Sequence, residues 1–99
     1  MARQDKLGKY MTTVSGSSGV MRVTYHNTEI VIFDSNKIIL NSGGWLTPTT
    51  KTRMNQASNQ FDLGYTVKQR EGNWYVYHNR LIHPFKDGIE LTREVVASV

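Results

Sequence analysis

Residues 47–61 read "TPTTKTRMNQASNQF", the one stretch of this chain in which the residues are spaced as in a helix. Thr47 is suited to cap a helix and Pro48 to occupy its first position. Side chains that suit a buried face recur at helical spacing, at Thr50, Met54, Ala57 and Phe61. The stretch is poor in strong helix formers, so packing of that face must hold the helix. We therefore predict a single helix from Thr47 to about Gln60.

The residues before this helix predict three strands. Residues 20–26, "VMRVTYH", alternate between two faces, as a half-buried strand does. Residues 29–34, "EIVIFD", are apolar on both faces and therefore suit a central position or one beneath a helix. Residues 38–40, "IIL", form the third strand, and turn residues separate the three segments. The pattern is typical of a β-meander.

The residues after the helix predict three or four more short strands. These are residues 65–70 "YTVKQR", 74–78 "WYVYH", 81–85 "LIHPF" and 89–91 "IEL". Pro84 offers no backbone N–H to a neighbour, which favours an edge position for its strand. We therefore predict an α+β fold with small antiparallel sheets of about six short strands and one helix, in the order β-β-β-α-β-β-β.

The N-terminal residues differ in character from the rest. Residues 1–19 carry few regularly spaced apolar side chains and end in a Gly/Ser cluster, so they cannot offset the entropy lost on ordering. We predict a flexible leader over residues 1–19 and a single α+β domain over residues 20–99. A chain of 99 residues suffices for one modest core, but not for a core plus a deep substrate cavity.

The composition excludes several classes of protein. The chain has no cysteine, hence no disulfide framework, thiolate nucleophile or thiol-ligated metal. No run approaches the roughly 18 consecutive apolar residues of a membrane helix, so we expect no membrane partner. Twelve Lys and Arg against eight Asp and Glu give a formal charge of +4. This charge favours an anionic partner such as nucleic acid, although a role in solubility explains it equally.

No motif has the spacing that catalysis or cofactor binding requires. His78 and His83 flank a turn in "HNRLIH", whose letters resemble an HNH nuclease, but strand pairing about that turn places the two rings diagonally. Two imidazoles without a third ligand make a poor metal site. We therefore expect no catalytic residue, no metal and no cofactor. A metal-dependent nuclease that uses His78 and His83 is the least favoured alternative.

The segment that leads into the helix, "NSGGWLTPTTKTRM" at residues 41–54, is the first candidate binding surface. Glycines let the backbone approach another surface closely, and a helix N-terminus offers unpaired amide hydrogens to an anion. The candidate residues, of which the last two are expected on the exposed side of the helix, are Gly43, Gly44, Trp45, Thr49, Lys51, Arg53, Asn55 and Gln56. A plain strand-to-helix connection explains the same residues. Trp45 is then either a lid on the core or a contact residue, and its burial distinguishes the two.

A second candidate surface lies on the strands after the helix. Its candidate residues are Lys68, Arg70, Tyr75 and Tyr77. The two tyrosines share one face of their strand, while Trp74 and Val76 share the other. If the tyrosines face solvent beside the two cations of the paired strand, they form a surface of the kind that stacks unpaired bases. The alternative is that all of the aromatic residues build the core.

Three stretches carry a resemblance to known proteins: "LNSGGWLTPTTKTRMNQ", "LGYTVKQREGNWYV" and "PFKDG". Through them, residues 22–91 resemble a group of small uncharacterised proteins common in tailed bacteriophages and viral metagenomes. The resemblance implies a phage source and the host cytoplasm as the location. It implies no catalytic residue.

Small accessory phage proteins often act by binding, and two hypotheses follow. The first is a non-enzymatic module that binds nucleic acid, DNA or RNA, through the basic helix N-terminus and the sheet face. The second is a phage inhibitor that binds a host protein, such as a nuclease of an antiviral defence system, as anti-CRISPR proteins do. The predicted edge strand near Pro84 suits such docking, and it also permits a homodimer.

Overall fold

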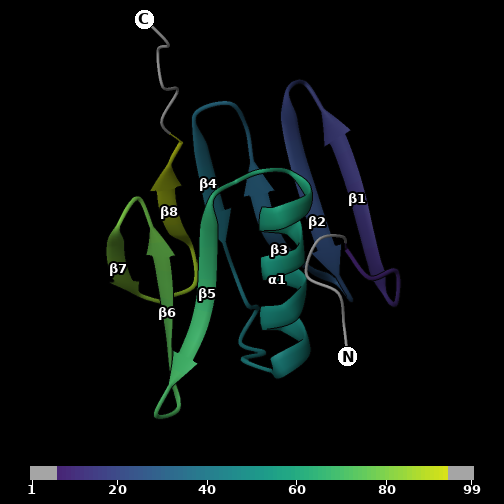
Figure 1. Ribbon diagram of the computed structural model, residues 1–99. Coiled ribbons are helices and arrows are strands. Elements are labelled where there is room, and N and C mark those ends of the chain that lie inside the picture. The colour runs from purple at the N-terminus through teal and green to yellow at the C-terminus, as the bar shows by residue number, and fades with distance from the viewer. Residues whose placement is uncertain (1–6, 94–99) are drawn as a thin grey trace, which may run out of the picture.

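The computed structural model of the protein describes residues 7–93, which form eight strands and one helix (Figure 1). In chain order the elements are β1 (Thr12–Ser17), β2 (Val20–Tyr25), β3 (Thr28–Phe33), β4 (Lys37–Leu40), α1 (Pro48–Gln60), β5 (Tyr65–Arg70), β6 (Asn73–His78), β7 (Leu81–Pro84) and β8 (Ile89–Thr92). The predicted α+β class is confirmed, with two strands more than the six expected. The helix lies where its cap and its spacing predict it, with Thr47 as the N-cap.

The strands form two antiparallel sheets. The five-stranded sheet has the order β1-β2-β3-β4-β8, and the three-stranded sheet has the order β5-β6-β7. Figure 1 shows α1 across the face of the five-stranded sheet, in front of β2 and β3, with β5 beside it. As predicted, β3 is central in its sheet, and β7, which contains Pro84, is an edge strand. The last strand, β8, returns to pair with β4 rather than with β7.

One face of the five-stranded sheet forms most of the hydrophobic core. Val23, Val31, Leu40 and Ile89 follow one another across four strands in register, and all four are buried. The helix packs Met54 and Ala57 onto this face, and both are fully buried. The three-stranded sheet completes the core with the inward side of β5 and β6, including Val67, Trp74 and Val76. Burial of this apolar surface is the main favourable term in the stability of the fold.

The prediction of a flexible leader over residues 1–19 is wrong for residues 12–17. They form β1, which pairs along its whole length with β2, from Thr12 opposite Tyr25 to Ser17 opposite Val20. Ser18 and Gly19, part of the cluster taken for a linker, both have positive φ (54° and 80°) and form the tight turn of a hairpin. Residues 1–6 of the predicted leader and 94–99 of the predicted domain lie outside the described residues.

Side chains of α1 occupy the open edge of β5. Asn55 accepts a hydrogen bond from the backbone N–H of Val67 (2.7 Å) and donates one to the carbonyl of the same residue (2.9 Å). One turn later, Ser58 Oγ accepts from Tyr65 N–H (3.0 Å) and donates to the Tyr65 carbonyl (2.6 Å). The helix therefore takes the place of a fourth strand, since it satisfies the N–H and C=O groups of two alternate residues.

A further bond in the interior strengthens the same contact. The Tyr65 hydroxyl donates to the Met54 carbonyl at 2.6 Å, inside the core. Burial raises the pKa of the Tyr65 hydroxyl, so this group stays protonated and remains a donor. The polar residues of α1 that the sequence suggested for binding therefore include at least one, Asn55, whose side chain holds the fold together.

Replacement of Asn55 by alanine tests this contact. Asn55→Ala leaves an N–H and a C=O of β5 without partners, and we expect the free energy of unfolding to fall by about 2 kcal/mol, despite the better helix propensity of alanine. Urea denaturation measures the change. The control is Asn36→Ala, because Asn36 lies in an exposed turn and its side chain bonds to no other residue of the described chain. Equal losses in the two variants would contradict the role of Asn55.

Candidate nucleic-acid interface

The outer face of the three-stranded sheet brings the second set of predicted residues together. In the register of β5 and β6, Lys68 lies opposite Tyr75, and Arg70 lies opposite Asn73. Trp74 and Val76 point to the other side of the sheet and are buried, while Tyr75 and Tyr77 are half-buried. Lys68 and Arg70 are exposed. We call this surface, made of Lys68, Arg70, Tyr75 and Tyr77, the basic–aromatic face.

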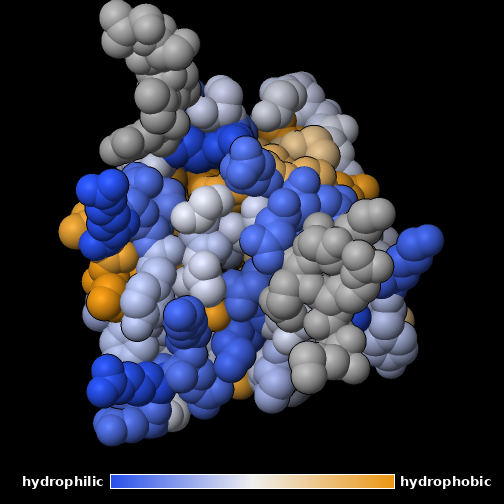
Figure 2. Space-filling model, viewed as in Figure 1, coloured by the Kyte–Doolittle hydropathy of each residue, from blue (hydrophilic) through white to orange (hydrophobic). Residues whose placement is uncertain are grey.

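The Lys68 ammonium and the Tyr77 ring are in contact on this face. The Lys68 ammonium lies 5.1 Å from the centroid of the Tyr77 ring, within the range of a cation–π interaction. The third strand extends the face, since Pro84 lies opposite Tyr75 and Ile82 lies opposite Tyr77. Figure 2 shows hydrophilic residues over β5 and β6 and hydrophobic residues at the left edge, over β7. The face thus combines positive charge, aromatic rings and a flat apolar border.

The chain segment that builds this sheet also carries much of the net positive charge. Residues 65–86 contain four basic residues, Lys68, Arg70, Arg80 and Lys86, and one acidic residue, Glu71. On the five-stranded sheet, basic and acidic residues pair within the described part of the chain, Arg22 with Glu29 (3.1 Å) and Lys37 with Glu90 (3.5 Å). An anionic ligand is therefore attracted to the three-stranded sheet more than to the five-stranded one.

The helix does not present the surface that the sequence predicted. Arg53, expected at an exposed flank, is only 9% exposed; its Nε donates to Thr12 Oγ1 (3.1 Å) and its Nη1 to Gln56 Oε1 (3.0 Å). Gln56, expected to be exposed, is buried, and its Oε1 also accepts from the Gly8 N–H (3.0 Å). The expectation that these residues face a partner is wrong, because residues 7–12 pack over this side of the helix and use its polar groups.

The residues at the start of the helix lie at the surface. Trp45 is 67% exposed, so the indole is not a lid on the core. Thr49 is exposed, and the Lys51 ammonium lies 3.4 Å from Gln69 Oε1. With Arg53 turned inward, the two predicted cations do not converge on the helix N-terminus. The anion seat that the sequence suggested there is not assembled in this structure.

The close approach predicted for the glycines occurs at Gly43, against the chain's own β2–β3 turn. A Cβ atom on Gly43 would lie 2.5 Å from Thr28 Oγ1, whereas a Cβ on Gly44 would meet nothing within 4 Å. Both glycines have positive φ, 64° and 85°. Gly43 therefore serves both backbone conformation and packing, and Gly44 serves conformation alone.

The two histidines of "HNRLIH" take the register that the sequence predicts. His78 lies opposite Leu81 and His83 opposite Val76, which places the rings diagonally. Among residues 7–93, no group of three or more His, Cys, Asp or Glu side chains could hold a metal ion. Carboxylates at turns support the backbone: Asp34 accepts from two N–H groups, which lower its pKa, and Asp87 accepts from Ser42.

A pocket that the sequence did not predict lies beside Trp45. Its volume is about 370 Å³, and it opens between the β2–β3 turn at His26 and Asn27, the loop at Ser42 and Trp45, and the first turn of α1. A second hollow has a volume of about 330 Å³. The residues that line it include Leu46, which follows Trp45 in the sequence, and Asn73 and Tyr75 of β6. Only the adjacent aromatic residues Tyr25 and His26 at the start of the turn could have signalled the first pocket, because its walls are distant in sequence.

Comparison with known proteins supports the resemblance on which the phage assignment was based. The profile of the Kyanoviridae Gp96 protein matches residues 1–92. The chain belongs to this phage protein family. A search of curated proteins and a search of solved structures each found no match. The Kyanoviridae Gp96 family name states no activity, so the function has to be inferred from the surface chemistry.

The described part of this Kyanoviridae Gp96 family member contains no helix with the length and apolar character that crossing a bilayer requires.

The two adjacent glycines allow a matched test of the close approach to Thr28. Gly44→Ala forces a non-glycine residue into the left-handed region, and we expect the free energy of unfolding to fall by about 1 kcal/mol. Gly43→Ala carries the same backbone cost plus displacement of the Thr28 side chain, so we expect a further loss of about 1 kcal/mol or more. Urea denaturation of both variants provides the comparison. Identical losses would show that contact with Thr28 does not matter.

Proposed function

We propose that this protein is a non-enzymatic phage protein that binds single-stranded nucleic acid on the basic–aromatic face. The observation that carries the proposal is the arrangement of Lys68 between two tyrosines, opposite Tyr75 and over the ring of Tyr77. Two rings on alternate residues of one strand offer two adjacent stacking platforms. The neighbouring cations are placed to contact the phosphates that connect the stacked bases.

An unpaired strand fits this face better than a duplex. A sheet surface stacks bases only when they are free of pairing, as in other sheet-based binders of single strands. Reading a duplex through its major groove requires a protruding helix or ribbon. In this chain the side chains of Arg53, Gln56 and Asn55 are engaged by Thr12, Gly8 and Val67, so these three candidate residues of α1 are not available to read a groove.

The proposal covers DNA and RNA alike, because stacking and phosphate contacts do not require the 2′-hydroxyl. It also places the protein in the host cytoplasm, where phage transcripts and replication intermediates supply unpaired strands. From the first candidate surface the proposal omits Arg53, Asn55 and Gln56, whose side chains make internal contacts, and it does not require Trp45, which is exposed but is not one of the four residues of the basic–aromatic face.

A second candidate function rests on the edge strand β7. Leu81 and Ile82 are 60% and 59% exposed, although both lie on a strand at the border of a sheet. An exposed apolar edge strand suits addition of a strand from another protein. A host protein, such as a nuclease of an antiviral defence system, or a second copy of this chain in a homodimer, would dock there. We favour nucleic acid, because the charge and the rings lie on the adjacent face rather than on this edge.

The salt dependence of binding tests the proposed function. We expect a fluorescently labelled oligothymidylate of about 12 nucleotides to bind with an affinity that falls steeply with salt. Lys68→Ala and Arg70→Ala should each reduce the slope of log K against log salt by about 0.7, the value for one phosphate contact on a single strand. Lys37→Ala is the control, since it removes the same charge from the five-stranded sheet. A flat salt response, or an equal effect of all three variants, would count against the proposal.

Stacking is tested separately on the tyrosines. Tyr75→Ala and Tyr77→Ala should each weaken oligonucleotide binding roughly tenfold, while Tyr→Phe at either position should retain most of the affinity. Tyr10→Ala is the matched control, because Tyr10 is exposed and lies before β1, away from this face. If Tyr10→Ala weakens binding as much as Tyr75→Ala does, the face does not stack the bases.

Affinity capture from host lysate with nuclease treatment distinguishes the second candidate. A host protein that remains bound after digestion, and that is lost in Leu81→Glu and Ile82→Glu, would favour docking at β7. Under our proposal the neutral variant Leu81→Ser, which removes an apolar side chain from the same edge, leaves oligonucleotide affinity unchanged within about twofold, since Leu81 lies opposite His78, off the basic–aromatic face, and the change adds no charge.

A further inference from the structure

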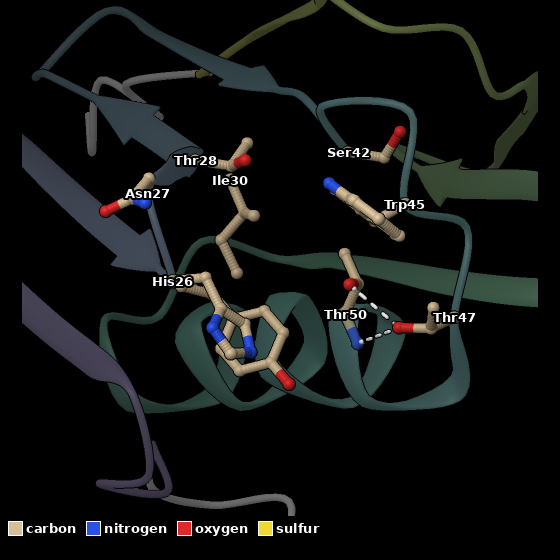
Figure 3. Close-up of a pocket in the computed structure, with 9 residues that line it drawn as sticks. His26, Asn27, Thr28, Ile30, Ser42, Trp45, Thr47 and Thr50 are labelled. Carbon is tan, nitrogen blue, oxygen red and sulfur yellow. Dashed lines mark hydrogen bonds between the residues drawn. The ribbon is translucent and has the colours of Figure 1, made fainter.

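We propose that the pocket beside Trp45 binds an uncharged heteroaromatic ring of the nucleobase type. Figure 3 shows Trp45 and His26 on opposite sides of the pocket, with Ile30 and Thr50 on the walls between them. Ile30 is buried and closes the interior end, while Trp45 stands at the open rim. The volume, about 370 Å³, is at the small end of the range for ligand sites, which suits a single heterocycle with its sugar.

Aromatic rings provide the stacking surfaces of this pocket. The rings of Tyr25 and His26 contact each other edge to face, with centroids 4.5 Å apart. Trp45 lies across the opening from His26 and is largely exposed, so its indole contributes little to the core. Burying such an indole against a flat ring is favourable, because the indole then loses contact with water and gains a stacking partner.

The lack of Asp, Glu, Lys and Arg among the nine described lining residues indicates that the ring bound here is uncharged. A phosphate or an ammonium group would therefore enter without a counter-charge, at the cost of its hydration. An uncharged heterocycle carries no such cost. The pocket thus complements the basic–aromatic face, which offers the cations that this pocket lacks.

Polar groups of the pocket walls remain available for the edge of a base. The side chains of Asn27 and Thr28 form no hydrogen bond with any other residue of 7–93, whereas the Thr47 and Thr50 hydroxyls bond to each other at 3.0 Å. An asparagine amide matches the paired donor and acceptor of a base edge. The aromatic walls together with this amide therefore favour a base.

The walls are held in place before any ligand arrives. Asp87 accepts hydrogen bonds from both Ser42 N–H (2.8 Å) and Ser42 Oγ (2.7 Å), which anchors the loop that carries Trp45. Gly43 allows this loop to approach Thr28. A site fixed in this way loses little conformational entropy when a ligand binds.

The position of the pocket relates it to the nucleic-acid strand that we propose is bound on the basic–aromatic face. Trp45 lines the pocket, the next residue, Leu46, lines the second hollow, and Tyr75 lines that hollow and belongs to the basic–aromatic face. A nucleic-acid strand that passes Tyr75 can therefore continue to Trp45. The base that enters has two sources, the bound strand or a free nucleoside, and only the first source rests on the proposed function.

NMR titration with neutral nucleosides tests the pocket by itself. We expect at least one of adenosine, guanosine, cytidine and uridine to shift the Trp45 indole N–H and the Asn27 side-chain amide, with a dissociation constant of about 1 mM or lower. The indole of Trp74, the other tryptophan, is buried and should not move. Trp45→Ala should weaken nucleoside binding at least tenfold, and Thr28→Val should weaken it less.

Control titrations define the outcomes that overturn the inference. Inorganic phosphate and methyl glucoside should leave both signals unchanged. A phosphate shift would make this an anion site at the helix N-terminus, a glucoside shift would make it a sugar site, and no shift with any nucleoside would leave no base site. Each of these three results contradicts the proposal.

Oligonucleotide binding by the Trp45→Ala variant identifies the source of the base. If the base comes from the strand, Trp45→Ala weakens oligonucleotide binding roughly tenfold and nucleosides compete. If the base is a free nucleoside, Trp45→Ala leaves oligonucleotide affinity unchanged while nucleoside binding is lost. Tyr75→Ala and Tyr77→Ala should leave nucleoside binding intact in either case. A protein that binds nucleosides but no oligonucleotide would refute the proposed function and support the pocket.

Discussion

The pair of hydrogen bonds between the Asn55 side chain and the backbone of Val67 is the contact on which the rest of the structure depends. With Ser58 on Tyr65, it closes the edge of β5 that would otherwise expose unpaired N–H and C=O groups. It also sets which way β5 faces. Because Tyr65 and Val67 turn toward the core, their alternate neighbours Thr66 and Lys68 turn outward. The basic–aromatic face is therefore a consequence of how the helix holds this strand.

The same use of polar helix residues explains why we propose a binding face on the sheet rather than on the helix. Arg53 and Gln56 are buried beneath residues 7–12, and they join β1 and the N-terminal segment to α1. A helix of this polarity cannot be stable through its apolar face alone, so its amides and guanidinium are used for packing. The cations that we propose for ligand contact are therefore Lys68 and Arg70 of the three-stranded sheet, in a segment, residues 65–86, that has one acidic residue and four basic ones.

Local pattern and non-local pairing account for what the sequence could and could not predict. The Thr47 cap, the alternation of Trp74 with Tyr75 and the register of His78 are local, and all were predicted. The strand at Thr12–Ser17 was missed, because its polar residues carry no apolar period and it is ordered by non-local contacts, chiefly its pairing with β2. The burial of Arg53 and the pocket beside Trp45 depend on segments 12 or more residues apart, for which one sequence holds no signal.

Native-state hydrogen exchange tests the closure of the β5 edge most directly. The account predicts that the amide protons of Tyr65 and Val67, bonded to Ser58 and Asn55, exchange as slowly as the central amides of β3, through global unfolding. An open edge would give the opposite result. Exchange of the Val67 amide at the rate of an unprotected peptide, with β3 still protected, would contradict the central claim that α1 serves as the fourth strand of this sheet.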